Sequence, residues 1–291
     1  MKALIAAYLG ALLLPAGVFA AALAGPYPPS AGQPGSMALA ATDPRFVAWV
    51  SAEADVALER GPRDVSDPGG PSATFGSERS VLGRPDADEG ATPPAPQQPD
   101  SVVSLGDGGR VTLSFSPPIT DGAGPDFAVF ENSFSDTFLE LAFVEVSSNG
   151  RHFVRFPTTS LTQTTTQIDQ NNPQARSVDP TEIDGFAGKY RAGFGTPFDL
   201  ADLAGSAGLD VAAVTHVRII DVVGAIDPAY GTRDSTGRLI NDPWPTPFVS
   251  GGFDLDAVGV LHQVPEPTTA VLFGFTALVA FSRRHRSPSG G

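Results

Sequence analysis

The sequence predicts an all-β protein, an antiparallel β-sandwich, from three observations. Within residues 101–156, five short apolar segments are separated by turn sequences. Val111, Leu113 and Phe115 alternate with polar residues, which is the period of a strand with one buried face. Asn149-Gly150 is the dipeptide that most strongly favours a tight hairpin turn. We therefore expect strands and turns throughout the centre of the chain.

The expected strands follow one another in order. Pro117-Pro118 should end the second of them, and the glycine-rich residues 106–109 should form the hairpin between the first two. The short apolar run 127–130 is typical of a strand covered on both faces. The sequence predicts strands at 102–105, 110–116, 127–130, 138–146, 152–156, 214–223 and 252–261.

One short helix is expected before these strands. Thr42-Asp43-Pro44 supplies a capping side chain followed by proline at the first helical position. The apolar residues of 46–50 would then close one end of the sandwich. Trp49 has two interpretations, a core residue or a platform that stacks on sugar, and its spacing favours the core.

Charge and composition exclude several function classes. The 291 residues carry a net charge of −14, which disfavours nucleic acid as a partner because such partners select clustered lysine and arginine. The chain has no cysteine, which excludes disulfides, thiolate zinc sites and cysteine nucleophiles. Acidic surfaces suit solubility and, where carboxylates converge, the binding of hard cations.

The N-terminus has the features of a secretory signal. Met1-Lys2 precedes an apolar run, and Ala22 and Ala24 form a small-x-small cleavage pattern. The alternative is a retained membrane helix, which Pro15 and Gly17 disfavour. We therefore expect residues 1–24 to be removed and residues 25–35, rich in proline and glycine, to form a flexible lead.

The C-terminus combines Val264-Pro265-Glu266-Pro267 with an apolar run at 269–281 and a basic cluster that includes Arg283, Arg284 and Arg286. This arrangement resembles the PEP-CTERM sorting signal of exported bacterial proteins. The resemblance implies recognition by an exosortase-type protease, then release or attachment at the cell surface. The apolar run is shorter than the roughly 20 residues of a full span, so anchoring in the inner membrane would be transient. A simple C-terminal anchor is the alternative, with the same topology.

The body of the chain carries a second resemblance. The stretches SLGDGGRVTLSFSPPITDGAGPDFAVFEN, FLELAFVEVSSNGRHFVRFP, YRAGFGTPFDLADLAG, THVRIIDVVG and SGGFDLDAVGV resemble an uncharacterised family of bacterial cell-surface proteins. Their pattern is similar to galactose-binding-like jelly rolls, which commonly bind glycans and a structural calcium. The resemblance covers about residues 44–262 and implies the jelly-roll type. Because no internal repeat is visible, we take residues 36–263 as one domain, with the sorting signal at 264–291.

Carboxylates are the best candidates for a metal site. Asp254 and Asp256 are two apart on one expected strand and should share a face. Buried acids need a cation, an arginine or N–H donors, so the alternative is a salt bridge from Arg218 or Arg191 with ordinary turn capping. The expected ligands of a structural calcium are Asp126, Glu131, Asp221, Asp254 and Asp256.

Catalysis is not favoured. No G-x-S-x-G motif occurs, and His152, His216 and His262 lie in or beside expected strands. We expect a noncatalytic, exported protein that associates with extracellular polysaccharide or envelope glycans. One alternative is a secreted glycoside hydrolase with two carboxylates about 5–9 Å apart in a groove with aromatic platforms. The other is a purely structural matrix protein.

Overall fold

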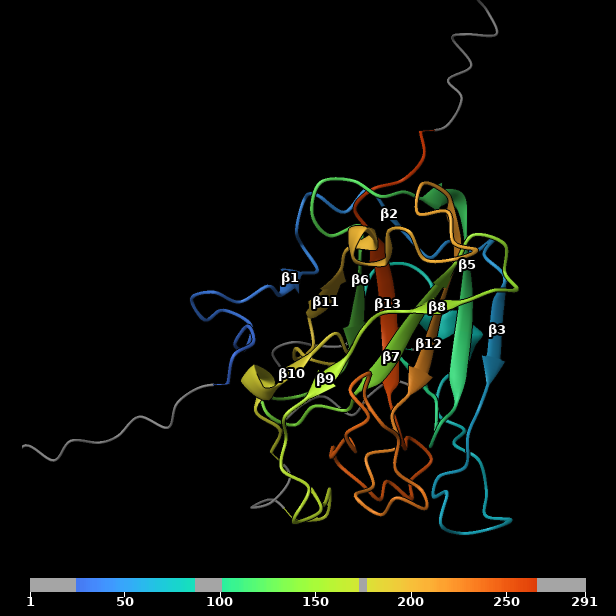
Figure 1. The fold of residues 1–291 in the computed structure, drawn as a ribbon. Helices are drawn as coiled ribbons and strands as arrows, with labels where there is room; N and C mark the ends of the chain where they lie inside the picture. Colours follow the sequence, from blue (N-terminus) through green and yellow to red (C-terminus); the bar gives the residue numbers. More distant parts are fainter. Residues whose placement is uncertain (1–24, 87–100, 173–176, 266–291) are drawn as a thin grey trace, which may run out of the picture.

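The computed structural model describes residues 25–86, 101–172 and 177–265. Two antiparallel sheets pack face to face, which confirms the predicted β-sandwich (Figure 1). The first sheet has the order β1 (Leu39–Ala40), β11 (Phe194–Phe198), β6 (Phe127–Glu131), β13 (Asp254–Val260) and β2 (Ala48–Trp49), with β4 (Val103–Ser104) also paired to β13. The second sheet has the order β3 (Val56–Glu59), β5 (Arg110–Ile119), β12 (Val214–Asp221), β7 (Ala142–Ser147) and β8 (Val154–Arg155).

The main core lies between the two sheets. Val111, Leu113 and Phe115 of β5 point into it, as their alternation predicts. The first sheet contributes Phe127 and Val129 of β6 together with apolar residues of β13. Burial of these side chains is the largest favourable contribution to the stability of the sandwich.

Each sheet is also covered on its outer face. Ala128 and Phe130 of β6 pack under Phe46 and Trp49, so β6 is buried on both faces as its continuous apolar run predicts. On the second sheet, Phe143 packs against residues from the segment 168–186. Within it, β10 (Ile183–Asp184) pairs with β9 (Thr159–Ser160), from earlier in the chain, to form a small ribbon beside the sandwich (Figure 1).

The expected helix near Thr42 is wrong. Residues 41–45 form turns, and the chain continues into β2, which pairs with β13. Phe46 and Trp49 therefore cover the outer face of the first sheet rather than close its end. The helices that the described residues form are 3-10 turns: η1 (Glu78–Val81), η2 (Pro180–Glu182) and η3 (Leu200–Leu203).

The five strands expected within residues 101–156 are present as β4 to β8, with three differences in detail. The strand expected at 138–146 begins only at Ala142. Residues 106–109 do not make a hairpin, because β4 and β5 belong to different sheets. Strand β5 also continues through Pro117 to Ile119. Its neighbour β3 pairs only with residues 110–113, and the pairing with β12 shifts register between Ser114 and Ile119, so the prolines lie at a break in the ladder.

Several predicted features lie outside the described residues. These are the cleavage residues Ala22 and Ala24, the terminal apolar segments, and Glu266, Pro267, Arg283, Arg284 and Arg286 of the sorting motif. Val264 and Pro265 are described and follow β13, where the Val264 N–H donates to the Pro118 carbonyl at 2.9 Å. No helix within the described ranges has the length and apolar character needed to cross a membrane.

Candidate functional site

The five acids predicted to bind calcium do not meet at one point. Asp126 precedes β6, whereas Glu131 ends it, which separates them by roughly 17 Å at about 3.3 Å per residue. Leu255 of β13 pairs with Glu131, so Asp254 and Asp256 lie at the same end of the sheet as Glu131. Asp221 ends β12 in the other sheet.

Asp126 is satisfied by N–H donors. Its carboxylate accepts from the backbone of Gly122 at 2.8 Å and Leu200 at 2.7 Å, and from His262 Nδ1 at 2.8 Å. Burial raises its pKa, and these hydrogen bonds oppose the rise. Asp121 and Asp199 each bring a carboxylate oxygen into a group with Asp126 whose atoms lie within 4.8 Å of one another. Within this group, Asp126 already has hydrogen-bond donors on both of its oxygens.

Asp221 is satisfied in the same way. One carboxylate oxygen accepts from the Phe253 N–H at 2.7 Å and the other from the Gly108 N–H at 2.9 Å. Burial raises its pKa well above the usual value, and the charge of Asp107 adds to this. The side chain therefore joins the end of β12 to the segment that begins β13.

The arginines expected to pair with these acids have other partners. Arg218 forms an ion pair with Glu145 at 3.3 Å and lies over the ring of Phe153. Arg191 pairs with Asp136 at 2.7 Å. The salt-bridge part of this alternative is therefore wrong for the predicted acids, whereas Asp126 and Asp221 accept from backbone N–H groups, as its capping part expects.

Glu131 and Asp254 belong to a buried acidic cluster. Asp254 accepts from Ser104 Oγ and from Asn132 Nδ2, the latter at 3.1 Å. Burial raises its pKa to about 7, although these hydrogen bonds and the charge of Arg60 lower it. Burial also raises the pKa of Glu131 well above its usual value, with a further contribution from the charge of Asp254. Asp256, nearby on β13, accepts from the Asp86 N–H at 3.1 Å.

Glu140 completes this cluster, and the sequence reasoning missed it. Ser133 Oγ donates to the Phe138 carbonyl, which closes the loop after β6 and returns Glu140 toward Glu131. Burial raises the pKa of Glu140, and the charges of Asp254 and Glu131 raise it further. The sequence feature that could have pointed to Glu140 is its position between two leucines. Leu139 and Leu141 are both fully buried in the structure.

A cavity of about 200 Å³ gives access to the cluster. Glu140 and Asp254 line it, together with Asn132, Gln170 and the aromatic rings of Phe134 and Phe138, which stack at 4.6 Å. Two buried oxygens in this region accept no hydrogen bond, Glu131 Oε1 and Gln170 Oε1. Such orphaned atoms are uncommon in folded proteins and call for an explanation.

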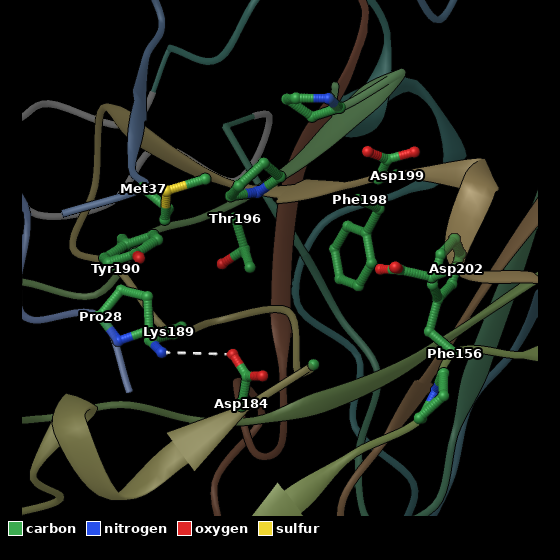
Figure 2. Close-up of a pocket in the computed structure, with 14 residues that line it drawn as sticks. Pro28, Met37, Phe156, Asp184, Lys189, Tyr190, Thr196, Phe198, Asp199 and Asp202 are labelled. Atoms are coloured by element: carbon green, nitrogen blue, oxygen red, sulfur yellow. Dashed lines mark ion pairs between the residues drawn. The ribbon is translucent and has the colours of Figure 1, made fainter. Parts of the chain in front are cut away.

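A separate groove of about 530 Å³ lies where β10 and β11 approach one another (Figure 2). Thr196 and Phe198 of β11 lie between its two sides. Its lining mixes apolar and charged groups. Figure 2 shows Met37, Lys189 and Tyr190 on one side and Asp199 and Asp202 on the other, with Asp184 below.

The polar groups of the groove are held in place by the surrounding backbone. Lys189 donates to the Ile183 carbonyl at 2.6 Å and lies 3.7 Å from Asp184 Oδ1. Burial lowers the pKa of Lys189 to about 8. Burial also raises the pKa of Asp202, and the charges of Asp199 and Asp184 add to this. Thr196 Oγ1 is buried and has no hydrogen-bond partner.

No family model, curated protein or solved structure matches the chain. The chemistry of the groove and of the acidic cavity therefore carries the functional argument. The groove contributes convergent hydrogen-bonding groups beside apolar surface, the usual composition of a small-molecule site. The cavity is lined by the carboxylates of Glu140 and Asp254, and Glu131 Oε1 nearby is buried without a hydrogen-bond partner.

Proposed function

We propose that the protein is an exported, noncatalytic module that binds an extracellular glycan in the groove of Figure 2. The observation that carries this proposal is the Thr196 hydroxyl, which is buried between the two sides of the groove without a partner. A buried hydroxyl in that position is suited to a ligand that brings its own donors and acceptors.

The groove suits saccharide chemistry. Sugar hydroxyls donate to carboxylates and accept from ammonium groups, and Asp184 and Lys189 supply one of each. Apolar C–H faces of a sugar pack on apolar side chains, and Tyr190 and Met37 supply such surface. A ligand that met all of these groups would be oriented as well as bound.

The charges of the groove favour neutral or amino sugars. The groove has three aspartates, Asp184, Asp199 and Asp202, and a single lysine, Lys189. Burial lowers the pKa of Lys189 to about 8, so its positive charge is lost slightly above neutral pH. The three aspartates would repel a sugar that itself carries a carboxylate. The expected ligand is therefore a neutral or amino-containing polysaccharide segment.

Export and surface location are part of the same proposal. They are supported by the signal-like residues 1–24 and by the motif at 264–267, which resembles a PEP-CTERM signal. We propose processing by an exosortase-type protease after transient anchoring. Mass spectrometry of the surface-released protein would test this, and a mature product that retained residues 270–291 would contradict it.

We also propose the jelly-roll class within the sandwich. The alternation of consecutive strands between the two sheets supports this, because β5 to β6, β6 to β7, β11 to β12 and β12 to β13 all change sheet. Such crossings bring chain ends and loops to the rims of the sheets, where the groove lies.

Isothermal titration of the protein with neutral, amino and uronic-acid oligosaccharides would test glycan binding. We expect binding to the first two classes. Thr196→Val removes the hydroxyl with little change of shape and should weaken binding about 3- to 10-fold, the value of one neutral hydrogen bond. Asp184→Asn should also weaken binding. The matched control is Asp55→Asn, at an exposed position just before β3 of the other sheet.

The same titration separates the alternatives. Release of new reducing ends from the oligosaccharides would identify a glycoside hydrolase and overturn the noncatalytic assignment. The absence of binding in every class would leave a structural matrix protein. Equal loss of affinity in Asp55→Asn and Thr196→Val would show that the groove is not the binding site.

A further inference from the structure

We propose that residues 25–37, which lead to β1, form a strap that completes the groove of Figure 2, and that Gly25 anchors this strap at Thr181 as the new amino terminus once residues 1–24 are removed. The inference rests on the proposed export and glycan binding. It adds a condition to them, because the groove then depends on where the processed chain begins.

The strap is tied to both of the elements between which the groove lies. Near its start, the Tyr27 N–H donates to the Thr181 carbonyl at 3.1 Å, in η2 directly before β10. After its end, β1 pairs with β11, with Leu39 opposite Gly195. Figure 1 shows this blue segment running from β1 toward β10. The strap therefore crosses from the β11 side of the groove to the β10 side.

Two residues of the strap line the groove directly. Figure 2 shows Pro28 and Met37 beside Lys189 and Tyr190. The ring centroid of Tyr27 lies 5.8 Å from the Nζ atom of Lys189, which is within the range of a cation–π contact. If the strap opened, the groove would lose apolar surface on this side, and Lys189 would lose an aromatic neighbour.

The middle of the strap is held by an arginine. Arg191 Nη1 donates to the Ala31 carbonyl at 3.1 Å, and the same guanidinium pairs with Asp136 at 2.7 Å. Ala31 is itself buried. The strap is thus fixed at its start, in its middle and at β1.

Gly25 lies so close to Thr181 that no side chain fits between them. A Cβ added at Gly25 would be 2.1 Å from the Thr181 carbonyl oxygen, so the backbone would have to move. The Gly25 N–H donates to Thr181 Oγ1 at 2.7 Å. The residue that follows the expected cleavage point is therefore one that the packing requires to be glycine.

Cleavage after Ala24 would strengthen this contact. Hydrolysis of the Ala24–Gly25 peptide bond consumes one water, leaves a carboxylate on Ala24 and frees an amine on Gly25, which is protonated near neutral pH. The Thr181 hydroxyl that accepts from Gly25 donates in turn to Asp179 Oδ1 at 2.7 Å. A charged donor makes a stronger hydrogen bond than an amide, and the carboxylate at the other end of the chain of hydrogen bonds complements its charge.

Mass spectrometry and hydrogen exchange of the exported protein test the anchor without any ligand. We expect Gly25 as the first residue. The Tyr27 amide should exchange about 10- to 100-fold faster in Thr181→Val, the value of one charge-assisted hydrogen bond. Thr164→Val, at an exposed position, is the control. A different first residue, or equal exchange in the two variants, would overturn the anchor. Exchange at the rate of an unfolded peptide would support the flexible lead expected from composition instead.

Acetylation of amines tests the charge and the wall. Lys189 is the single lysine of the processed chain and its side chain is 3% exposed, so mild acetylation should modify Gly25 first. We expect this modification to speed exchange at Tyr27, and we expect Thr181→Val to speed acetylation of Lys189 about 3- to 10-fold. Unchanged exchange in the acetylated protein would refute the role of the ammonium. Unchanged acetylation of Lys189 would refute the strap as a wall of the groove.

Oligosaccharide titration then tests the effect on binding. Gly25 and Thr181 do not line the groove, so Gly25→Ala and Thr181→Val act on it through the strap. We expect both to weaken binding at least about threefold, because a wall that opens part of the time lowers the competent fraction. Gln33→Ala, at an exposed position of the strap, is the control. Undiminished affinity in both variants would overturn the strap's part in binding.

The measurements keep the two proposals apart. If no oligosaccharide binds the exported protein, glycan binding is refuted, whereas exchange at Tyr27 and acetylation of Lys189 still confirm or refute the strap. If oligosaccharides bind equally well to the native protein and to both strap variants, glycan binding stands and the strap is refuted.

Discussion

Lys189 is a basic residue enclosed by an acidic protein. It is one of two lysines in the chain, the other being Lys2, and its side chain is 3% exposed. Burial lowers the pKa of Lys189 to about 8, and the charge of Asp184 opposes the change. Below pH 8 the folded protein therefore carries the full cost of burying an ammonium group.

The pH dependence of this cost has a definite sign. Between about pH 8 and 10.5, the unfolded chain binds a proton at this lysine that the folded chain has released, so stability rises with pH. Relative to Lys189→Met, the free energy of unfolding of the native protein should rise by on the order of 3 kcal/mol across that window. Urea unfolding of both proteins at several pH values measures it. A difference that stays flat or falls would contradict the shift.

Strand β6 organises the first sheet because both of its faces are buried. Its inner residues enter the core, and outer Phe130 lies 5.7 Å from the ring of Phe46 and 5.4 Å from that of Trp49. Gly195 on the neighbouring β11 makes room for this ring, since an added Cβ would lie 2.7 Å from it. The aromatic layer thus depends on a glycine in the adjacent strand.

Truncation of Phe130 should measure the strength of this layer. We expect Phe130→Ala to lower the free energy of unfolding by about 3–5 kcal/mol, because it removes a fully buried ring and leaves a cavity. Val47→Ala, at a site 63% exposed, should change it by less than about 0.5 kcal/mol. Denaturant unfolding compares the two. A small effect of Phe130→Ala would mean that the outer layer collapses to refill the space.

The two sheets are joined by side chains as well as by the core. Asp221, at the end of β12 in the second sheet, accepts hydrogen bonds from Gly108 and from Phe253, which leads into β13 of the first sheet. A carboxylate in this position satisfies two backbone donors that the turn geometry leaves without ladder partners. The sandwich is thereby closed at the end that also holds the acidic cavity.

Removal of this link should destabilise the whole molecule. Asp221→Ala leaves two buried N–H groups without acceptors, and we expect a loss of about 2–5 kcal/mol in the free energy of unfolding. Asp55→Ala is the control, because that aspartate is exposed and should contribute less than about 0.5 kcal/mol. Circular dichroism during urea unfolding provides the measurement. Equal effects of the two variants would refute a linking role for Asp221.

Local patterns in the sequence determined the class of fold. The alternation in β5, the continuous apolar run of β6 and Asn149-Gly150 before β8 each depend on neighbouring residues alone, and all three are present as predicted. The expected helix after Thr42 failed for the opposite reason. Its capping signal was local, but pairing of β2 with β13 and the burial of Phe46 override local preference.

Only the tertiary structure decided which acids meet. Glu131 and Asp254 lie more than a hundred residues apart, and strand register brings them to the same end of one sheet while it sends Asp126 to the other. Glu140 joins them because a loop closes through Ser133. Register and loop closure depend on contacts between distant segments, so composition and spacing alone do not predict them.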